Sequence, residues 1–228
     1  TDSNTIYDAS LDALRLTESS GAVTSSGEYT FNTVVDLSHV YDINIRKNIK
    51  SNSYFLDSLW DERTGLIDSW GTIDDSGSTS ADKCNAILYI RKTDDNPSSG
   101  SPTWDSWREF SNSLIRGRGF QFKLKLTSGD SNQNIKVTEL GVFIETQGRT
   151  ESIATPVTTS SSAYTVTFAK AFKETPNIAI TQTNQQSGDF YVLASISRTG
   201  FQVTFKNGSS AVVRNFLWAA VGFGKEIT

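Results

Sequence analysis

Short stretches of alternating apolar and polar residues recur along the whole chain. In such a stretch every second side chain points to the same face of a strand, so one face can be buried while the other meets water. The clearest examples are Tyr29–Phe31, Tyr41–Ile45, Phe120–Leu126, Tyr164–Phe168 and Phe201–Lys206. The connecting residues are mostly Ser, Thr, Gly, Asn and Asp, which favour turns. The pattern therefore predicts an all-β protein built from antiparallel sheets.

A helical spacing of apolar residues occurs in one short segment, Leu11–Leu16, which is the single helix that the pattern allows. The expected strands fall into two groups, separated by a polar segment after Glu145. We expect a jelly-roll-like β-sandwich over residues 1–147, with long loops rich in Trp and Asp, and a second β-sandwich of six strands over residues 148–228. The strands expected in the two modules are 29–36, 40–50, 86–90, 118–127 and 135–145, then 151–157, 163–168, 177–182, 190–197, 200–206 and 214–223.

The last of these strands contains an apolar run, Phe216–Phe223, that does not alternate. A strand of this composition is typical of positions that are covered on both faces. The run therefore predicts either the central strand of a sheet or a strand at a subunit interface.

Charge and composition exclude several classes of function. The 228 residues include 21 Lys and Arg against 25 Asp and Glu, a net charge of −4, with no basic cluster of the kind that binds nucleic acid. The run Phe216–Phe223 is too short to cross a membrane as a helix. A single cysteine, Cys84, excludes an internal disulfide and a thiolate zinc site. The single histidine, His39, is expected in a turn or at a strand edge. The chain begins at Thr1 and contains no Met, so we expect a fragment of a longer protein.

Four of the five tryptophans lie in loop-like sequence of the first module, next to Asp and Ser: Trp60, Trp70, Trp104 and Trp107. An indole face with a carboxylate and a hydroxyl beside it suits a sugar, because the indole stacks on the C–H face while the polar groups fix the hydroxyls. The alternative interpretation is that these indoles pack the loops onto the sandwich.

The acidic side chains of the same loops could serve calcium binding or glycoside hydrolysis. None of them has the spacing of an EF-hand loop, and sequence alone does not place two carboxylates at a catalytic separation. With one His, one Cys and no nucleophile elbow, we expect no enzymatic activity, no metal and no cofactor. The acids concerned are Asp57, Asp61, Asp68, Asp74, Asp75, Asp94 and Asp95.

The second module resembles the H-type lectin-like domain, in particular the versions at the C-termini of phage tail fibres. The likeness is carried by residues 164–168, 176–180, 187–192, 199–203 and 216–222. The first module is similar to a region that precedes the C-terminus in tail-tip host-specificity proteins of long-tailed phages. That likeness is carried by residues 57–61, 65–68, 86–97, 104–107 and 120–124.

The resemblance implies a sandwich, a homotrimer and a place in the virion, in contact with other tail proteins. It does not imply the sugar site of H-type lectins, because Val192, Gly208 and Val212 stand where those lectins have an arginine, a tryptophan and a tyrosine. The nearest polar substitutes for a receptor contact are Asp189, Tyr191 and Arg214.

The expected function is adsorption to a bacterial surface receptor, either a polysaccharide or an outer-membrane protein, without catalysis and without membrane insertion. Two alternatives remain at this stage. The modules could be a structural spacer and trimerisation cap of a fibre, or a carbohydrate-binding module of a secreted hydrolase.

Overall fold

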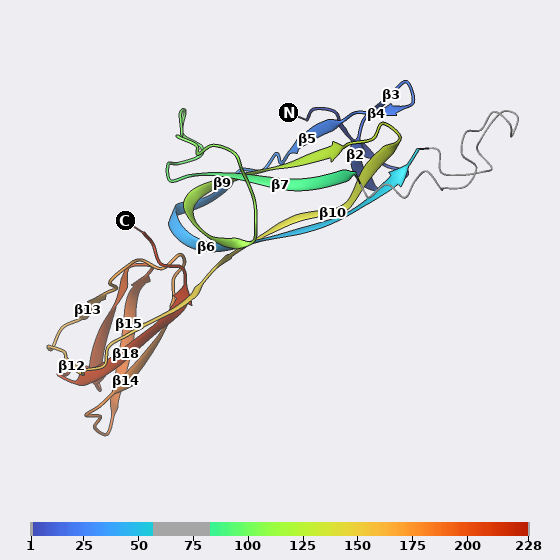
Figure 1. Ribbon diagram of the computed structural model, residues 1–228. Coiled ribbons are helices and arrows are strands. Elements are labelled where there is room, and N and C mark those ends of the chain that lie inside the picture. Colours follow the sequence, from blue (N-terminus) through green and yellow to red (C-terminus); the bar gives the residue numbers. More distant parts are fainter. Residues whose placement is uncertain (1, 57–82, 228) are drawn as a thin grey trace, which may run out of the picture. The chain divides into compact units, whose positions relative to one another are not determined.

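The computed structural model describes residues 2–56 and 83–227, and all secondary structure in them is β (Figure 1). The chain divides into two compact units. Unit 1 consists of Thr1–Asp36, Ile45–Ser113 and Gly119–Phe143, and unit 2 of Leu37–Asn44, Leu114–Arg118 and Ile144–Thr228. The described residues include no helix that is long and apolar enough to cross a membrane.

Unit 1 is built around one antiparallel sheet of eight strands. The strand order is β1-β2-β10-β6-β9-β7-β8, and β5 also pairs with β9. A separate pair, β3 and β4, forms a small hairpin. The strands are β1 (Thr5–Asp8), β2 (Ala13–Leu16), β3 (Glu18–Ser19), β4 (Ala22–Val23), β5 (Ser26–Thr30), β6 (Val35–Phe55), β7 (Cys84–Thr93), β8 (Arg108–Glu109), β9 (Ser113–Ser128) and β10 (Gln133–Thr146).

The core of unit 1 includes a cluster of aliphatic side chains from β2, β9 and β10. Leu124 and Leu126 of β9 pack against Leu16 of β2 and against Ile135 and Val137 of β10. Burial of an aliphatic side chain of this size stabilises a fold by about 1.5–3 kcal/mol. In the segment Phe120–Leu126 the apolar residues form one buried row, and the polar residues between them point outward, as the alternation predicts.

Unit 2 is a sandwich of two four-stranded sheets. In one sheet β18 lies between β14 and the strands β11 and β12, and in the other β16 lies between β15 and the strands β13 and β17 (Figure 1). The strands are β11 (Gly148–Ser152), β12 (Val157–Thr158), β13 (Tyr164–Thr167), β14 (Asn177–Gln182), β15 (Asp189–Ser197), β16 (Gly200–Asn207), β17 (Ser210–Ala211) and β18 (Asn215–Phe223).

The core of unit 2 is largely aromatic. Alternate residues of β16 and β18 point inward and are buried, among them Phe201, Phe205, Phe216 and Trp218. Phe201 and Trp218 meet edge to face, with ring centroids 5.9 Å apart, a favourable geometry for aromatic pairs. The sequence predicts β18 either at the centre of a sheet or at a subunit interface. In the structure β18 is central in its sheet, and its outer face is only partly covered within one chain.

The structure corrects two expectations. The segment Leu11–Leu16 is not a helix: it ends in β2, because Ala13 and Leu16 fill the core while the strand pairs with β1 and β10. His39 is not in a turn or at a strand edge but lies within the 21-residue strand β6. Besides residues 144–228, unit 2 also includes the segments Leu37–Asn44 and Leu114–Arg118.

Candidate functional site

An ion pair between Asp189 and Arg214 is buried at one end of the unit 2 sandwich. Asp189 opens β15, and Arg214 immediately precedes β18. Arg214 donates from Nε to Oδ2 of Asp189 at 2.6 Å and from Nη2 to Oδ1 at 2.8 Å. The side chain of Asp189 is 0% exposed and that of Arg214 is 11% exposed. The pair therefore links two strands of different sheets through two parallel charged hydrogen bonds.

Further hydrogen bonds occupy the Asp189 carboxylate. It accepts hydrogen bonds from Gln182 Nε2 at 2.8 Å, from the Gln186 amide at 2.7 Å and from Asn207 Nδ2 at 2.9 Å. The Arg214 guanidinium, assisted by these donors, holds the pKa of Asp189 well below its usual range. Asp189 and Arg214, which the sequence suggested as receptor contacts, are thus engaged with one another and act as the frame of this end of the sandwich.

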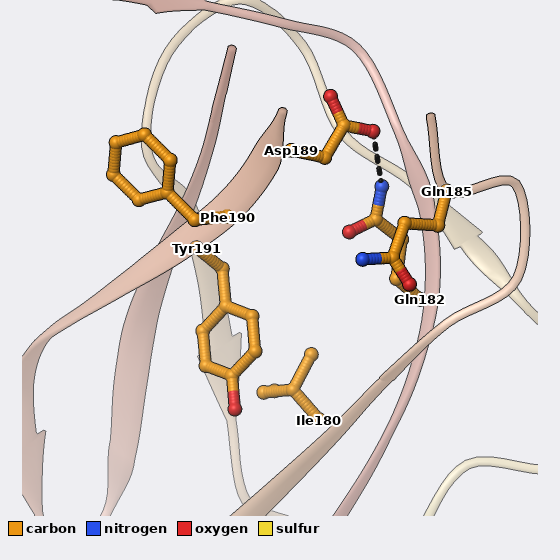
Figure 2. A pocket seen from close by; sticks show the side chains of 6 residues that line it. All are labelled: Ile180, Gln182, Gln185, Asp189, Phe190 and Tyr191. Atoms are coloured by element: carbon orange, nitrogen blue, oxygen red, sulfur yellow. Dashed lines mark hydrogen bonds between the residues drawn. The ribbon is translucent and has the colours of Figure 1, made fainter. Parts of the chain in front are cut away.

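A pocket of about 350 Å³ lies above this frame. It is lined by Ile180, Gln182, Gln185, Asp189, Phe190 and Tyr191. Figure 2 shows the Gln182 and Gln185 amides beside Asp189 on one side of the pocket and the Tyr191 ring beside Ile180 on the other. Because the carboxylate is already neutralised by Arg214, the lining offers amides and aromatic carbon without a free charge.

Two aromatic side chains of this lining are open to solvent. Phe190 is 46% exposed and Tyr191 is 44% exposed. They are consecutive residues of β15, so their rings lie on opposite faces of the strand, and Figure 2 shows the Tyr191 ring toward the pocket and the Phe190 ring turned away from it. Exposed rings beside amide groups are the usual composition of a surface that binds an amphipathic ligand. Such a site can bind a ligand by stacking and hydrogen bonding.

Trp104 and Trp107 lie together in unit 1, where both are half-buried against the side chain of Arg91. The Arg91 guanidinium carbon is 5.0 Å from the centroid of the Trp104 ring and 4.8 Å from that of Trp107. Lys123 Nζ lies 5.0 Å from the Trp107 ring. The structure therefore gathers two of the four predicted loop tryptophans around cations of the sheet.

The other two predicted tryptophans, Trp60 and Trp70, lie outside the described residues, as do Asp57, Asp61, Asp68, Asp74 and Asp75. Within 2–56 and 83–227, no three His, Cys, Asp or Glu side chains are placed to hold a metal ion. Asp95 is used within its own loop, where Oδ2 accepts a hydrogen bond from the Thr103 amide at 2.7 Å.

The sequence reasoning missed Phe190, Gln182, Gln185 and Arg91. A signal for Phe190 was present, because three consecutive large apolar residues, 190–192, interrupt the alternation of a strand. Arg91 gave no such signal, since its environment depends on a loop that returns from more than ten residues along the chain.

No family model matches the chain, and no curated protein or solved structure matches it.

Proposed function

We propose that this chain is the distal, receptor-binding part of a phage tail fibre or tail-tip protein, which adsorbs to a bacterial surface without catalysis. The residue patterns that resemble H-type lectin-like and tail-tip regions support this proposal. In this proposal the protein belongs to the virion, outside the bacterial cell, next to other tail proteins.

One observation carries the proposal. The exposed ring of Tyr191 stands beside an uncharged pocket whose frame, the pair of Asp189 and Arg214, is buried. An exposed aromatic ring at a pocket is typical of a binding surface. Trp104 and Trp107 of unit 1 supply a second region for contact with the receptor.

Adsorption competition with the purified protein tests this proposal. We expect the protein to reduce phage adsorption to host cells, and Tyr191→Ala to weaken that competition by about tenfold or more, because it removes the stacking surface at the pocket. Phe190→Ala is the matched control, since Phe190 is the neighbouring exposed aromatic residue of β15 and its ring points away from the pocket. Full competition by Tyr191→Ala would contradict the assignment of the receptor contact to this pocket.

The proposed assembly is a homotrimer. Residues of β11, β14 and β18 that share the outer face of their sheet include no charged side chain: Gly148, Thr150, Ser152, Asn177, Ala179, Thr181, Leu217, Ala219, Val221 and Phe223. Val221 is 51% exposed and Phe223 is 58% exposed in the single chain. An uncharged sheet face with an apolar central row suits contact with another copy of the chain.

This uncharged face equally favours a second function, that of a structural spacer and trimerisation cap. A cap forms trimers but does not compete for the host surface, so the adsorption experiment separates the two. Release of reducing sugar from host polysaccharide would instead indicate a hydrolase and contradict the non-catalytic proposal.

A further inference from the structure

Arg91 lies on the outward face of the unit 1 sheet, between two indole rings. It points outward from β7, directly opposite Gln121 of β9, and donates from Nε to Gln121 Oε1 at 2.7 Å. Trp104 and Trp107 come from the segment that follows β7. The guanidinium carbon lies 5.0 Å from the centroid of the Trp104 ring and 4.8 Å from that of Trp107, within the range of a cation–π contact. Burial between these rings lowers the pKa of Arg91 below its ordinary value, because desolvation disfavours the charged form.

The charge of Arg91 has no carboxylate partner among the described residues, which distinguishes it from other partly covered arginines. Arg15, Arg149, Arg198 and Arg214 each form a salt bridge to an Asp or Glu. The hydrogen bonds found for Arg91 in the described part of the chain use Nε, so the paired N–H groups of Nη1 and Nη2 hold no acceptor there.

Two neighbouring lysines are already paired with carboxylates. Lys123 donates to both carboxylate oxygens of Glu28, at 3.0 and 3.1 Å. Lys92 pairs with Asp94 at 3.4 Å and with Asp105 at 3.8 Å. Lys125 lies two residues beyond Lys123 on β9 and on the same outward face of the sheet. Arg91 therefore places a guanidinium without a carboxylate partner, among the described residues, at the centre of this aromatic platform, and Lys125 is a second cation on the same face.

We infer that Arg91, Trp104 and Trp107 form a site for the carboxylate of an acidic sugar. A guanidinium fork accepts a carboxylate through two parallel hydrogen bonds, and indole rings pack against the C–H face of the attached sugar ring. A single central charge matches a monoanion. This inference rests on the proposed function, for which it names an acidic surface polysaccharide as the receptor class.

Titration calorimetry with an oligogalacturonate probe tests the site. We expect saturable binding that weakens as salt is added, because the contact is charge-assisted. The methyl-esterified oligogalacturonate is the matched probe, since it keeps the sugar rings and removes only the charge. We expect it to bind at least about tenfold more weakly. Equal binding of the two probes would overturn the inference.

Arg91→Gln should reduce the affinity for oligogalacturonate by about tenfold or more, because it removes the charge and the fork. Arg91→Lys keeps the charge without the fork, so we expect an intermediate loss and a variant that retains the contact with the indoles. Lys50→Gln is the control, an equal loss of charge at a side chain of unit 1 that is 64% exposed. Unchanged affinity in a folded Arg91→Lys or Arg91→Gln variant would refute the assignment, and competition by inorganic phosphate at equal concentration would reassign the site to phosphate.

Adsorption measured in parallel separates the two proposals. Competition for host cells without oligogalacturonate binding overturns the acidic-sugar site and leaves the proposed function standing. Binding of oligogalacturonate without any competition for host cells overturns the proposed function and supports the site.

Discussion

Gly200 allows β13 and β16 to approach each other in unit 2. A Cβ atom at this position would lie 2.1 Å from the carbonyl oxygen of Val166, which is backbone and cannot rotate away. We therefore expect Gly200→Ala to destabilise the protein by about 3 kcal/mol, the upper range for overpacking. Urea unfolding followed by circular dichroism measures the change.

Gly148→Ala is the matched control for this substitution. Gly148 also belongs to a strand of unit 2, but a Cβ atom there meets nothing within 4 Å. We expect its unfolding midpoint to equal that of the wild type or to rise slightly, because alanine restricts the unfolded chain more than glycine does. A similar loss in both variants would show that the Val166 carbonyl is not the cause.

The buried carboxylate of Asp189 makes stability depend on acid pH. Its pKa in the folded protein is held below the ordinary value, chiefly by Arg214, whereas the unfolded carboxyl titrates near about 3.9. The ion pair is therefore fully stabilising above about pH 4 and is lost as pH falls from there toward the folded pKa.

The variant Asp189→Asn separates the contribution of this ion pair to stability from the contributions of the other acidic residues. We expect its thermal unfolding midpoint to lie below that of the wild type at pH 7, because Arg214 loses its counter-ion, and the gap to narrow as pH falls below about 4. Asp8→Asn is the comparison in unit 1, since the pKa of Asp8 is also lowered, to about 2, by hydrogen bonds from Ser10 and Arg15. A gap independent of pH would contradict the role of the charge.

At the scale of elements, alternation predicted the strands that fill the cores. Phe201–Lys206 and Phe120–Leu126 are strands of the described fold, with alternate residues buried as expected. The short strands β3, β4, β8, β12 and β17 were missed, because two residues are too few for a period to be recognised. The helical spacing of Leu11–Leu16 was overruled by pairing with distant β10, which no local pattern reveals.

The candidate site was less predictable than the fold. Tyr191 could be selected as a polar side chain next to Val192, but the sequence does not show that both carboxylate oxygens of Asp189 accept hydrogen bonds from Arg214, 25 residues away. The site around Arg91 was equally hard to predict, because the contact of Arg91 with Trp104 and Trp107 depends on where the segment before β8 lies on the sheet. Long-range side-chain partners are fixed by tertiary packing.

Arg198 fastens the C-terminal segment of unit 2. It donates to the Phe172 carbonyl at 2.8 Å, to Tyr41 Oη at 3.0 Å and to Glu226 Oε2 at 2.7 Å. The same segment is held by the Ile227 amide, which donates to the Val40 carbonyl at 2.9 Å. A charged hydrogen-bond network of this kind stabilises local structure by more than a single neutral hydrogen bond.

We expect Arg198→Met to loosen this segment without unfolding the sandwich. Hydrogen exchange at the amides of Glu226 and Ile227 should become about tenfold faster, as for the loss of one charged hydrogen bond. Amides of β16 should be unaffected. Lys173→Met, which removes an exposed pair with Glu174, is the control and should leave both sets unchanged. Uniform acceleration across unit 2 in Arg198→Met would mean that Arg198 stabilises the whole sandwich.

At the scale of the whole molecule, the proposed trimer depends on the uncharged outer face of the sheet formed by β11, β14 and β18. Val221 sits in the central row of that face and is 51% exposed in the single chain, so a glutamate there is compatible with folding. In a symmetric trimer, however, each substitution occurs at every interface and places an unpaired charge in a desolvated contact, which costs several kcal/mol.

We expect the wild-type protein to sediment as a trimer at micromolar concentration and Val221→Glu to sediment as a monomer with unchanged circular dichroism. Val213→Glu is the matched control, an equally exposed valine of unit 2 outside this face, and should remain trimeric. A monomeric wild type would contradict the trimer itself, and a trimeric Val221→Glu would place the interface on another surface.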